Sequence, residues 1–301
     1  MIDSHVHLLT YEMLEDSKLR FEKQYPGSSE MLVKKATHLI NPLFINYLKE
    51  RTLDDFANIW LSEMDTNGID TAVFFPISER PEQIRDFVAI APDRFIGYAY
   101  LNDPLADDAP ERLRKQVKEY GFKGLKLYPC LQLFHAYDKK VFPLYEEAQS
   151  LGIPITFHMG ITHAPTADYR YTNPLDLQLP LRLFPDLNFI VAHFGAGFFR
   201  EVCLIAYHTD NFYLDTSGTN NWRDYTPERM ELMDVFRRAI DILGPSRILF
   251  GTDTVMRPDS GYRKAIMEEQ KAIVTSLCQN SSDAEKILGG NAAELFKISQ
   301  K

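Results

Sequence analysis

The sequence predicts a single (β/α)8 barrel of the TIM type over residues 1–301, with a long insertion after the first strand. Eight short runs rich in β-branched and aromatic residues recur along the chain, and longer amphipathic segments separate them. This alternation, with no break in composition, favours parallel strands joined by crossover helices. An open doubly wound sheet is the weaker alternative, because no glycine-rich dinucleotide motif follows the first strand.

The eight runs have the pattern and length of strands. The first, Ile2–Leu8, alternates apolar and polar residues with a period of two, which is typical of a strand. The others are shorter and mostly apolar, as expected for strands that are buried on both faces. These are 70–75, 94–100, 122–128, 153–158, 188–193, 211–215 and 247–253.

The segments between the runs predict helices, and several carry signals at their ends. The predicted helices span 53–67, 81–91, 109–120, 138–151 and 227–243. Glycine often terminates a helix, and it follows four of them just before the next strand, at Gly68, Gly121, Gly152 and Gly244. Thr226 followed by Pro227 predicts the N-cap and first position of the last helix.

The segment 9–52 is the one departure from the repeating pattern. It spans more than forty residues between the first strand and the first predicted helix, and it is rich in charged and aromatic residues. A connection of this length is usually functional or disordered. In a barrel it would emerge at the C-terminal ends of the strands, where active sites lie. We therefore predict a partly helical lid, with a packing insertion or a dimer contact as the alternative.

Composition restricts the class of protein and its partners. The chain is 45% hydrophobic and 25% charged, as in ordinary globular proteins, and its net charge of −9 argues against nucleic-acid binding. No apolar run is long enough for a membrane span, and the N-terminus does not resemble a signal peptide. The three cysteines lack CxxC spacing. We expect a cytoplasmic protein that acts on a small molecule, and barrels of this size often form homo-oligomers.

Polar residues stand at the ends of five predicted strands, where a barrel would bring them together. His5 and His7 point to one face of the first strand, about 7 Å apart along it, and can converge on one metal ion. Lys126, His158, His193 and Asp253 end the fourth, fifth, sixth and eighth strands. Four histidines and an aspartate at one barrel mouth predict a metal site. Tyr128, Trp222 and the turn 215–218 are expected to line this mouth.

Five motifs at these strand ends resemble the amidohydrolase superfamily, and more narrowly its amidohydrolase-related (amidohydrolase 2) branch. They are Asp3-Ser-His-Val-His7, Gly124-Leu-Lys-Leu-Tyr-Pro129, Phe157-His-Met-Gly160, Ala192-His-Phe-Gly195 and Phe250-Gly-Thr-Asp253. The run Ile287–Phe296 resembles the closing helix of that branch. The resemblance covers essentially the whole chain and is weakest over 9–52. This branch contains TIM-barrel metal hydrolases and non-oxidative decarboxylases.

The resemblance implies roles for the strand-end residues. His5, His7, His158 and Asp253 would bind one divalent ion, for which we expect Zn²⁺, although Mn²⁺ or Fe²⁺ would also fit these ligands. Asp253 would also carry a proton during turnover. His193 would act as a base and electrophile, or as a ligand to a second metal.

Lys126 decides between one metal and two. In binuclear members of the superfamily a lysine at this position is carboxylated and bridges two ions. In mononuclear members a comparable lysine is retained, and here it would bind a substrate carboxylate. We favour one metal. Arg80, Arg170 and Arg257 follow strands and are further candidates to clamp a substrate carboxylate.

Three functions are compatible with this site. The leading hypothesis is hydrolysis of a small amide, lactone or cyclic ester by a metal-activated water. The alternative is non-oxidative decarboxylation of an aromatic or enol carboxylic acid, in which the metal would hold the substrate's hydroxyl and carboxylate. Both use the same ligands, so the residues discriminate poorly between them. A barrel that uses its metal only for stability is the third hypothesis, and it fits badly with a ligand set at the mouth.

Overall fold

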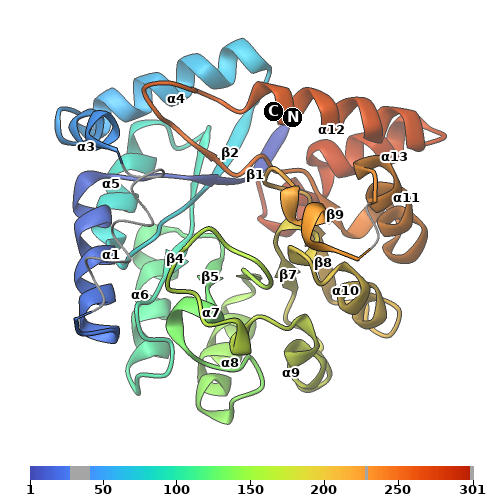
Figure 1. Ribbon diagram of the computed structural model, residues 1–301, viewed down its shortest axis with the longest axis horizontal. Helices are drawn as coiled ribbons and strands as arrows, with labels where there is room; N and C mark the ends of the chain where they lie inside the picture. Colours follow the sequence, from blue (N-terminus) through green and yellow to red (C-terminus); the bar gives the residue numbers. More distant parts are fainter. Residues whose placement is uncertain (28–40, 228–229, 299–301) are drawn as a thin grey trace.

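The computed structural model of the protein describes residues 1–27, 41–227 and 230–298. It is a barrel of parallel strands with helices around the outside, as Figure 1 shows in a view along the barrel. The predicted TIM barrel is therefore confirmed. The strands are β1 (Ile2–His7), β2 (Thr71–Phe75), β3 (Phe95–Gly97), β4 (Ala99–Tyr100), β5 (Leu125–Leu127), β6 (Ile155–Phe157), β7 (Phe189–Val191), β8 (Phe212–Asp215), β9 (Ile248–Leu249) and β10 (Thr254–Val255).

The ten labelled strands make eight positions around the barrel, because two positions are split. β3 and β4 are the two halves of the third strand: β3 pairs with β2, and β4 pairs with β5. β9 and β10 likewise share the eighth position, where β9 pairs with β8 and β10 pairs with β1. The barrel closes there, since the Ser4 amide donates to the Phe250 carbonyl at 2.9 Å and the Asp253 amide donates to the His5 carbonyl at 2.8 Å.

Helices follow the strands and form the outer layer. They are α1 (Tyr11–Gln24), α3 (Pro42–Lys49), α4 (Leu53–Asn67), α5 (Pro81–Ile90), α6 (Ala109–Tyr120), α7 (Pro129–Gln132), α8 (Phe142–Leu151), α9 (Gln178–Leu183), α10 (Phe199–Ala206), α11 (Leu232–Leu243), α12 (Lys264–Leu277), α13 (Ser281–Glu285) and α14 (Asn291–Leu295). Thr52 and Asp55 form a capping box at the start of α4, and Gly68 ends that helix with φ of 67°. The predicted bounds of α4 and α6 agree with the structure.

The predicted start of α11 is wrong. The helix begins at Leu232, with Glu231 at the N-cap, five residues after Pro227. Thr226 instead ends a short 3-10 turn, Asn221–Tyr225, where its hydroxyl donates to the Arg223 carbonyl at 2.9 Å. A threonine-proline pair is compatible with the end of one turn as well as with the start of a helix, and local sequence does not separate these cases.

Alternate residues of the strands face the helices and the barrel interior. Phe74 of β2 points outward and packs edge-to-face on Trp60 of α4 and on Phe87 of α5, with ring centroids 4.9 Å apart in each pair. Burial of each large aromatic side chain contributes about 2–3 kcal/mol. The next residue, Phe75, points inward, and its ring centroid is 4.3 Å from that of His5. The hydrophobic outer layer thus fixes which side chains reach the interior.

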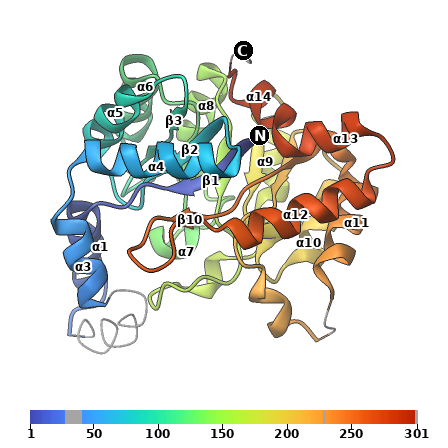
Figure 2. The same cartoon turned by 90° about the horizontal axis from the view of Figure 1, so that it is seen from above.

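The insertion 9–52 is partly helical, as predicted, and includes α1 and α3; its residues 28–40 lie outside the described part of the chain. Figure 2 shows α1 and α3 at the end of the barrel that also carries α7, away from the two chain termini. This is the end at which the strands finish, so the insertion borders the barrel mouth. Its function as a lid stays a prediction.

Candidate metal centre

Three ionisable side chains converge at the barrel mouth. The ligand atoms of His5, His193 and Asp253 all lie within 4.8 Å of one another. His5 comes from β1, His193 from the turn after β7, and Asp253 from the link between β9 and β10. Elements far apart in the sequence therefore supply one cluster, and imidazole nitrogens with a carboxylate oxygen are ligands that divalent transition metals prefer.

His5 is oriented by a carboxylate and a hydroxyl at the end of β8 and in the loop that follows it. Its Nδ1 lies 2.5 Å from Oδ2 of Asp215, at the end of β8, and 3.1 Å from Oγ of Ser217. An ionised carboxylate only accepts hydrogen bonds, so Nδ1 of His5 carries the proton. The lone pair is then on Nε2, which is buried and has no hydrogen-bond partner among the described residues.

His193 is held in an unusual backbone conformation by the same two residues. Its φ is 58°, and Phe194 follows with φ of 53°, a left-handed region that costs a non-glycine residue of the order of 1 kcal/mol. The His193 amide donates to Oδ1 of Asp215 at 3.3 Å, and Nδ1 donates to the Ser217 carbonyl at 3.1 Å. Nε2 of His193 therefore also presents a lone pair.

The two other predicted histidine ligands adjoin the cluster. Nδ1 of His7 donates to the Phe75 carbonyl at 3.0 Å, which leaves Nε2 facing Oδ1 of Asp253 at 3.1 Å. His158 donates from Nε2 to the Ile161 carbonyl at 3.2 Å, and its Nδ1 is buried without a partner in the described residues. The ring centroids of His158 and His193 are 4.9 Å apart.

Burial keeps these imidazoles in the form that binds metals. Loss of hydration lowers the pKa of His5 to about 3, although the nearby Asp215 carboxylate opposes this change. Burial likewise lowers the pKa of His158 and of His193. A metal binds neutral imidazole and competes with protons for it, so a low pKa favours the metal.

Asp253 stays ionised because of its neighbours. Burial by itself would raise the pKa of this carboxyl, but the adjacent His7 and His193 imidazoles hold it well below the usual range. Arg263 adds a second contact, since its Nη1 is 3.2 Å from Oδ2 of Asp253. Asp253 also has a left-handed backbone, with φ of 57°. Its carboxylate is therefore fixed in orientation and negatively charged.

Lys126 is buried beside this cluster without a hydrogen-bond partner for Nζ in the described part of the chain. The ammonium lies over the rings of Phe75 and Tyr128, 4.9 Å from each centroid. Burial lowers its pKa to about 8, while the charges of Asp215 and Asp253 oppose the change. A buried cation that lacks a partner is costly, so it is ready to take up an anion.

Buried polar atoms without hydrogen-bond partners among the described residues show whether a metal fits this site. Nε2 of His5, Nδ1 of His158 and Nζ of Lys126 are all buried, and none has a hydrogen-bond partner within residues 1–27, 41–227 and 230–298. Buried polar groups are normally hydrogen-bonded, and a divalent ion is a natural partner for an unprotonated imidazole nitrogen. The residues present therefore fit a divalent metal.

Sequence reasoning underrated two residues that organise the site. Asp215 is expected from the sequence only to line the mouth, but the structure shows that it contacts both His5 and His193. Its position after an apolar strand is the signal that it shares with the predicted ligands. Arg263, at the start of α12, carries no such signal, and only the fold brings it to Asp253.

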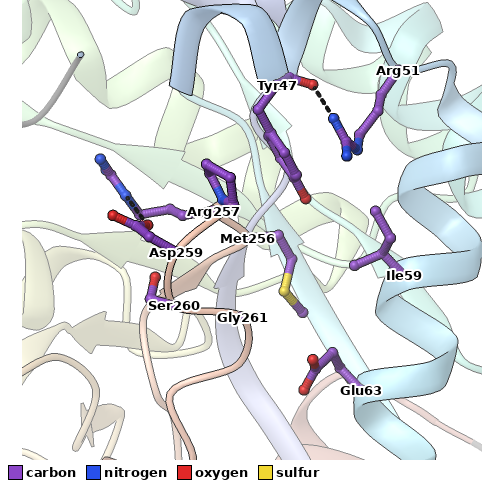
Figure 3. Close-up of a pocket in the computed structure, with 10 residues that line it drawn as sticks. Tyr47, Arg51, Ile59, Glu63, Met256, Arg257, Asp259, Ser260 and Gly261 are labelled. Atoms are coloured by element: carbon purple, nitrogen blue, oxygen red, sulfur yellow. Dashed lines mark hydrogen bonds and ion pairs between the residues drawn. The ribbon is translucent and has the colours of Figure 1, made fainter. Parts of the chain in front are cut away.

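The three predicted arginine clamps lie elsewhere. Arg80 is paired with Asp16 of α1, and Arg170 with Asp168. Arg257 lines a separate pocket of about 560 Å³ outside the barrel, between α4 and the loop after β10. Figure 3 shows this pocket with Tyr47 and Arg51 on one side and Asp259 on another. None of the metal-centre residues lines it.

A parallel (β/α)8 barrel with histidines and an aspartate gathered at its mouth defines a class of TIM-barrel enzymes equipped to hold a divalent metal. A family model described as Amidohydrolase matches residues 2–298. The chain therefore belongs to the amidohydrolase family, as its motifs predict.

The most similar proteins include decarboxylases. The gamma-resorcylate decarboxylase of Polaromonas sp. is 27% identical to this chain, and the match covers 79% of this chain and 86% of the relative. The structure of 5-carboxyvanillate decarboxylase from Sphingomonas paucimobilis matches with a TM-score of 0.70 and 17% identity, covering 99% of each chain. A second 5-carboxyvanillate decarboxylase structure, from Novosphingobium aromaticivorans, was solved with manganese and 4-hydroxy-3-methoxy-5-nitrobenzoic acid. It matches with a TM-score of 0.71 and 15% identity, covering 98% of this chain and 95% of the other.

These comparisons correct the leading functional prediction. Hydrolysis of an amide, lactone or cyclic ester is wrong as the first choice, because the curated relatives and several of the similar solved structures are named as decarboxylases. Both reactions use the same ligand set, so the residues alone discriminate poorly between them. The histidines and the aspartate at the mouth support a divalent metal, as does a similar structure solved with manganese. Neither observation indicates zinc in particular. Among the described residues, no helix is both long and apolar enough to cross a membrane.

Proposed function

We propose that the protein is a metal-dependent decarboxylase that removes CO₂ from a small aromatic carboxylic acid without an oxidant. The proposal is carried by Lys126, whose buried Nζ has no hydrogen-bond partner in the part of the chain that the structure describes and which lies beside histidines with free lone pairs. A cation in that position suits a substrate carboxylate. The decarboxylase names of the relatives support the same reaction.

His5, His7, His158 and Asp253 would hold one divalent ion, either Zn²⁺ or Mn²⁺, and His193 stands next to them. When bound, the ion would withdraw electron density from the carboxylate and from a neighbouring hydroxyl of the substrate. Asp215 and Ser217 would fix the rings of His5 and His193 through the Nδ1 contacts described above. The protein thus supplies a rigid set of ligands rather than one that assembles on binding.

Lys126 would bind and orient the carboxylate that leaves. Its ammonium has no hydrogen-bond acceptor among the described residues, so its N–H groups are open to the substrate anion. The aromatic rings of Phe75 and Tyr128 on either side exclude water and present flat surfaces to a flat substrate. Once the carboxylate has become neutral CO₂, this attraction is lost, which favours release of the product.

Proton transfer would depend on Asp253, with His193 as the neighbouring base. Cleavage of the bond between ring and carboxylate leaves an electron pair on the ring carbon, and one proton must be added there for each CO₂ formed. Asp253 is ionised and held by His7 and Arg263, so it can take a proton from the substrate's hydroxyl or from solvent and deliver it to the ring.

The experiment is a product assay on the protein as purified and after loading with Zn²⁺ or Mn²⁺. Hydroxybenzoates with a carboxylate next to a hydroxyl are incubated with the protein, and released CO₂ and the phenol are measured together. Equal amounts of the two products are expected. Absence of both with either metal, while the substrates bind, would refute the proposal, and acid release without CO₂ would indicate hydrolysis.

A further inference from the structure

Helix α1 is joined to the barrel mouth by a row of three polar side chains on one face. Asp16, Arg20 and Gln24 are spaced by four residues, so they lie above one another on the helix. Asp16 pairs with Arg80, beyond β2, at 2.5 Å. Gln24 donates to the Leu131 carbonyl, within α7 after β5, at 2.9 Å. The helix therefore crosses the ends of successive strands.

Arg20, the middle residue of this row, reaches the hydroxyl of a residue that faces the barrel interior. Its Nη1 donates to Tyr100 Oη at 2.8 Å, and Tyr100 ends β4. Tyr98, two residues earlier, points inward, since its hydroxyl is 3.1 Å from that of Thr156. Alternation along the strand gives Tyr100 the same direction. Tyr100 is also the register partner of Lys126 on β5, so both side chains belong to one face.

Arg20 makes no ion pair with a carboxylate among the described residues, although its charge helps to lower the pKa of Asp16, which is itself paired with Arg80. The hydrogen bonds of Arg20 go to neutral acceptors, which are Tyr100 Oη, Asn102 Oδ1 at 3.0 Å and the Ile77 carbonyl at 3.4 Å. Other arginines of this rim are ion paired, for example Arg112 with Glu79 at 2.7 Å. Within the described residues, Arg20 is therefore a second cation without a direct ion pair, on the side of the mouth where Lys126 is buried.

We infer that Arg20 is a specificity-determining residue, which binds an anionic group on the far side of the substrate ring from the carboxylate that leaves. The inference rests on the proposed function for the position of the substrate, with its reacting carboxylate at Lys126 and the metal ligands. A second carboxylate would then reach the rim and meet the guanidinium, with the Tyr100 hydroxyl beside it. The preferred substrates are aromatic acids with two anionic groups rather than one.

The test compares binding of two ligands that differ by one carboxylate. Calorimetry of the 301-residue protein, with its metal, gives the dissociation constants for 2-hydroxybenzoate and for 2-hydroxybenzene-1,4-dicarboxylate. A charged hydrogen bond predicts that the dicarboxylate binds roughly 10- to 100-fold more tightly. Arg20→Gln keeps a hydrogen-bond donor near Tyr100 but removes the charge, and it should abolish this preference. Gln24→Ala is the matched control, because it removes a neighbouring contact of α1 and no charge.

Each outcome of the binding experiment supports or overturns the proposed role of Arg20. Loss of the preference in Arg20→Gln, with the preference kept in Gln24→Ala, supports the inference. An equal loss in both variants would show that α1 acts only by packing, and a wild-type protein without the preference would overturn the inference directly. Binding is measured apart from turnover, so absence of CO₂ release together with an Arg20-dependent preference would refute the proposed reaction and leave the role of Arg20 intact.

Discussion

Replacement of Lys126 by methionine should make the protein more stable and inactive. Lys126 is fully buried, and its Nζ has no hydrogen-bond partner in the described residues. The side chain of methionine has a similar length and lacks the charge. The substitution therefore removes the cost of burying an ammonium group while keeping the contacts with Phe75 and Tyr128.

The size of the expected gain in stability follows from the pKa of Lys126. Burial lowers the pKa of Lys126 from 10.5 to about 8, which corresponds to about 3 kcal/mol of folding free energy. The folded protein holds the lysine proton less tightly than the unfolded chain does, so the charge destabilises the fold. This cost is fully present below pH 8 and disappears as the pH rises towards 10.5. The free energy of unfolding of Lys126→Met should therefore exceed that of the wild type by about 3 kcal/mol at pH 7 and by much less at pH 10.5.

The assay is denaturant unfolding of both proteins after removal of metal, at pH 7 and near pH 10.5. Metal is removed because a bound cation would add its own repulsion to the ammonium. Lys118→Met is the control: this lysine of α6 is exposed, and its loss should change stability by no more than about 0.5 kcal/mol. A variant no more stable than the wild type at pH 7, or a difference that does not change with pH, would refute the reasoning.

Three further changes address the metal centre. Asp215→Asn should weaken metal binding about 10- to 100-fold, because the amide would no longer hold the His5 tautomer; a metal titration that matches the wild type would contradict this role. His158→Ala should lower the metal content of the purified protein, as measured by elemental analysis, and unchanged stoichiometry would remove His158 from the ligand set. Asp253→Asn should abolish CO₂ release while the circular dichroism spectrum stays that of the wild type, and retained turnover would exclude Asp253 as the proton carrier.

The fold could be predicted from the sequence because its signals are local. Apolar runs of strand length alternate with amphipathic segments, and glycine or a capping pair marks the helix ends, as at Gly68 and Thr52. These preferences depend on residues a few positions apart, so α4 and α6 agree with their predicted bounds. The predicted start of α11 was wrong for the same reason, because the local signal at Thr226 fits both the end of a turn and the start of a helix.

The functional distinction was not available from this chain's residues. Histidines and an aspartate at strand ends indicate a metal, but hydrolases and decarboxylases place the same groups around it. The choice between the two reactions therefore came from relatives. Lys126 is buried and lacks a hydrogen-bond partner among the residues that the structure describes. This state, which the proposed reaction uses, is a property of its surroundings rather than of its position in the sequence.

By itself the sequence determined the barrel and the residue types at its mouth, including His5, His193 and Asp253. Only the tertiary structure decided how they are oriented and charged. Asp215 meets His5 across 210 positions of the chain, and Arg20 meets Tyr100 across 80. Such contacts exist only after the barrel has closed and α1 has packed on its rim. No periodicity or spacing encodes them, because their geometry depends on the whole fold rather than on neighbouring residues.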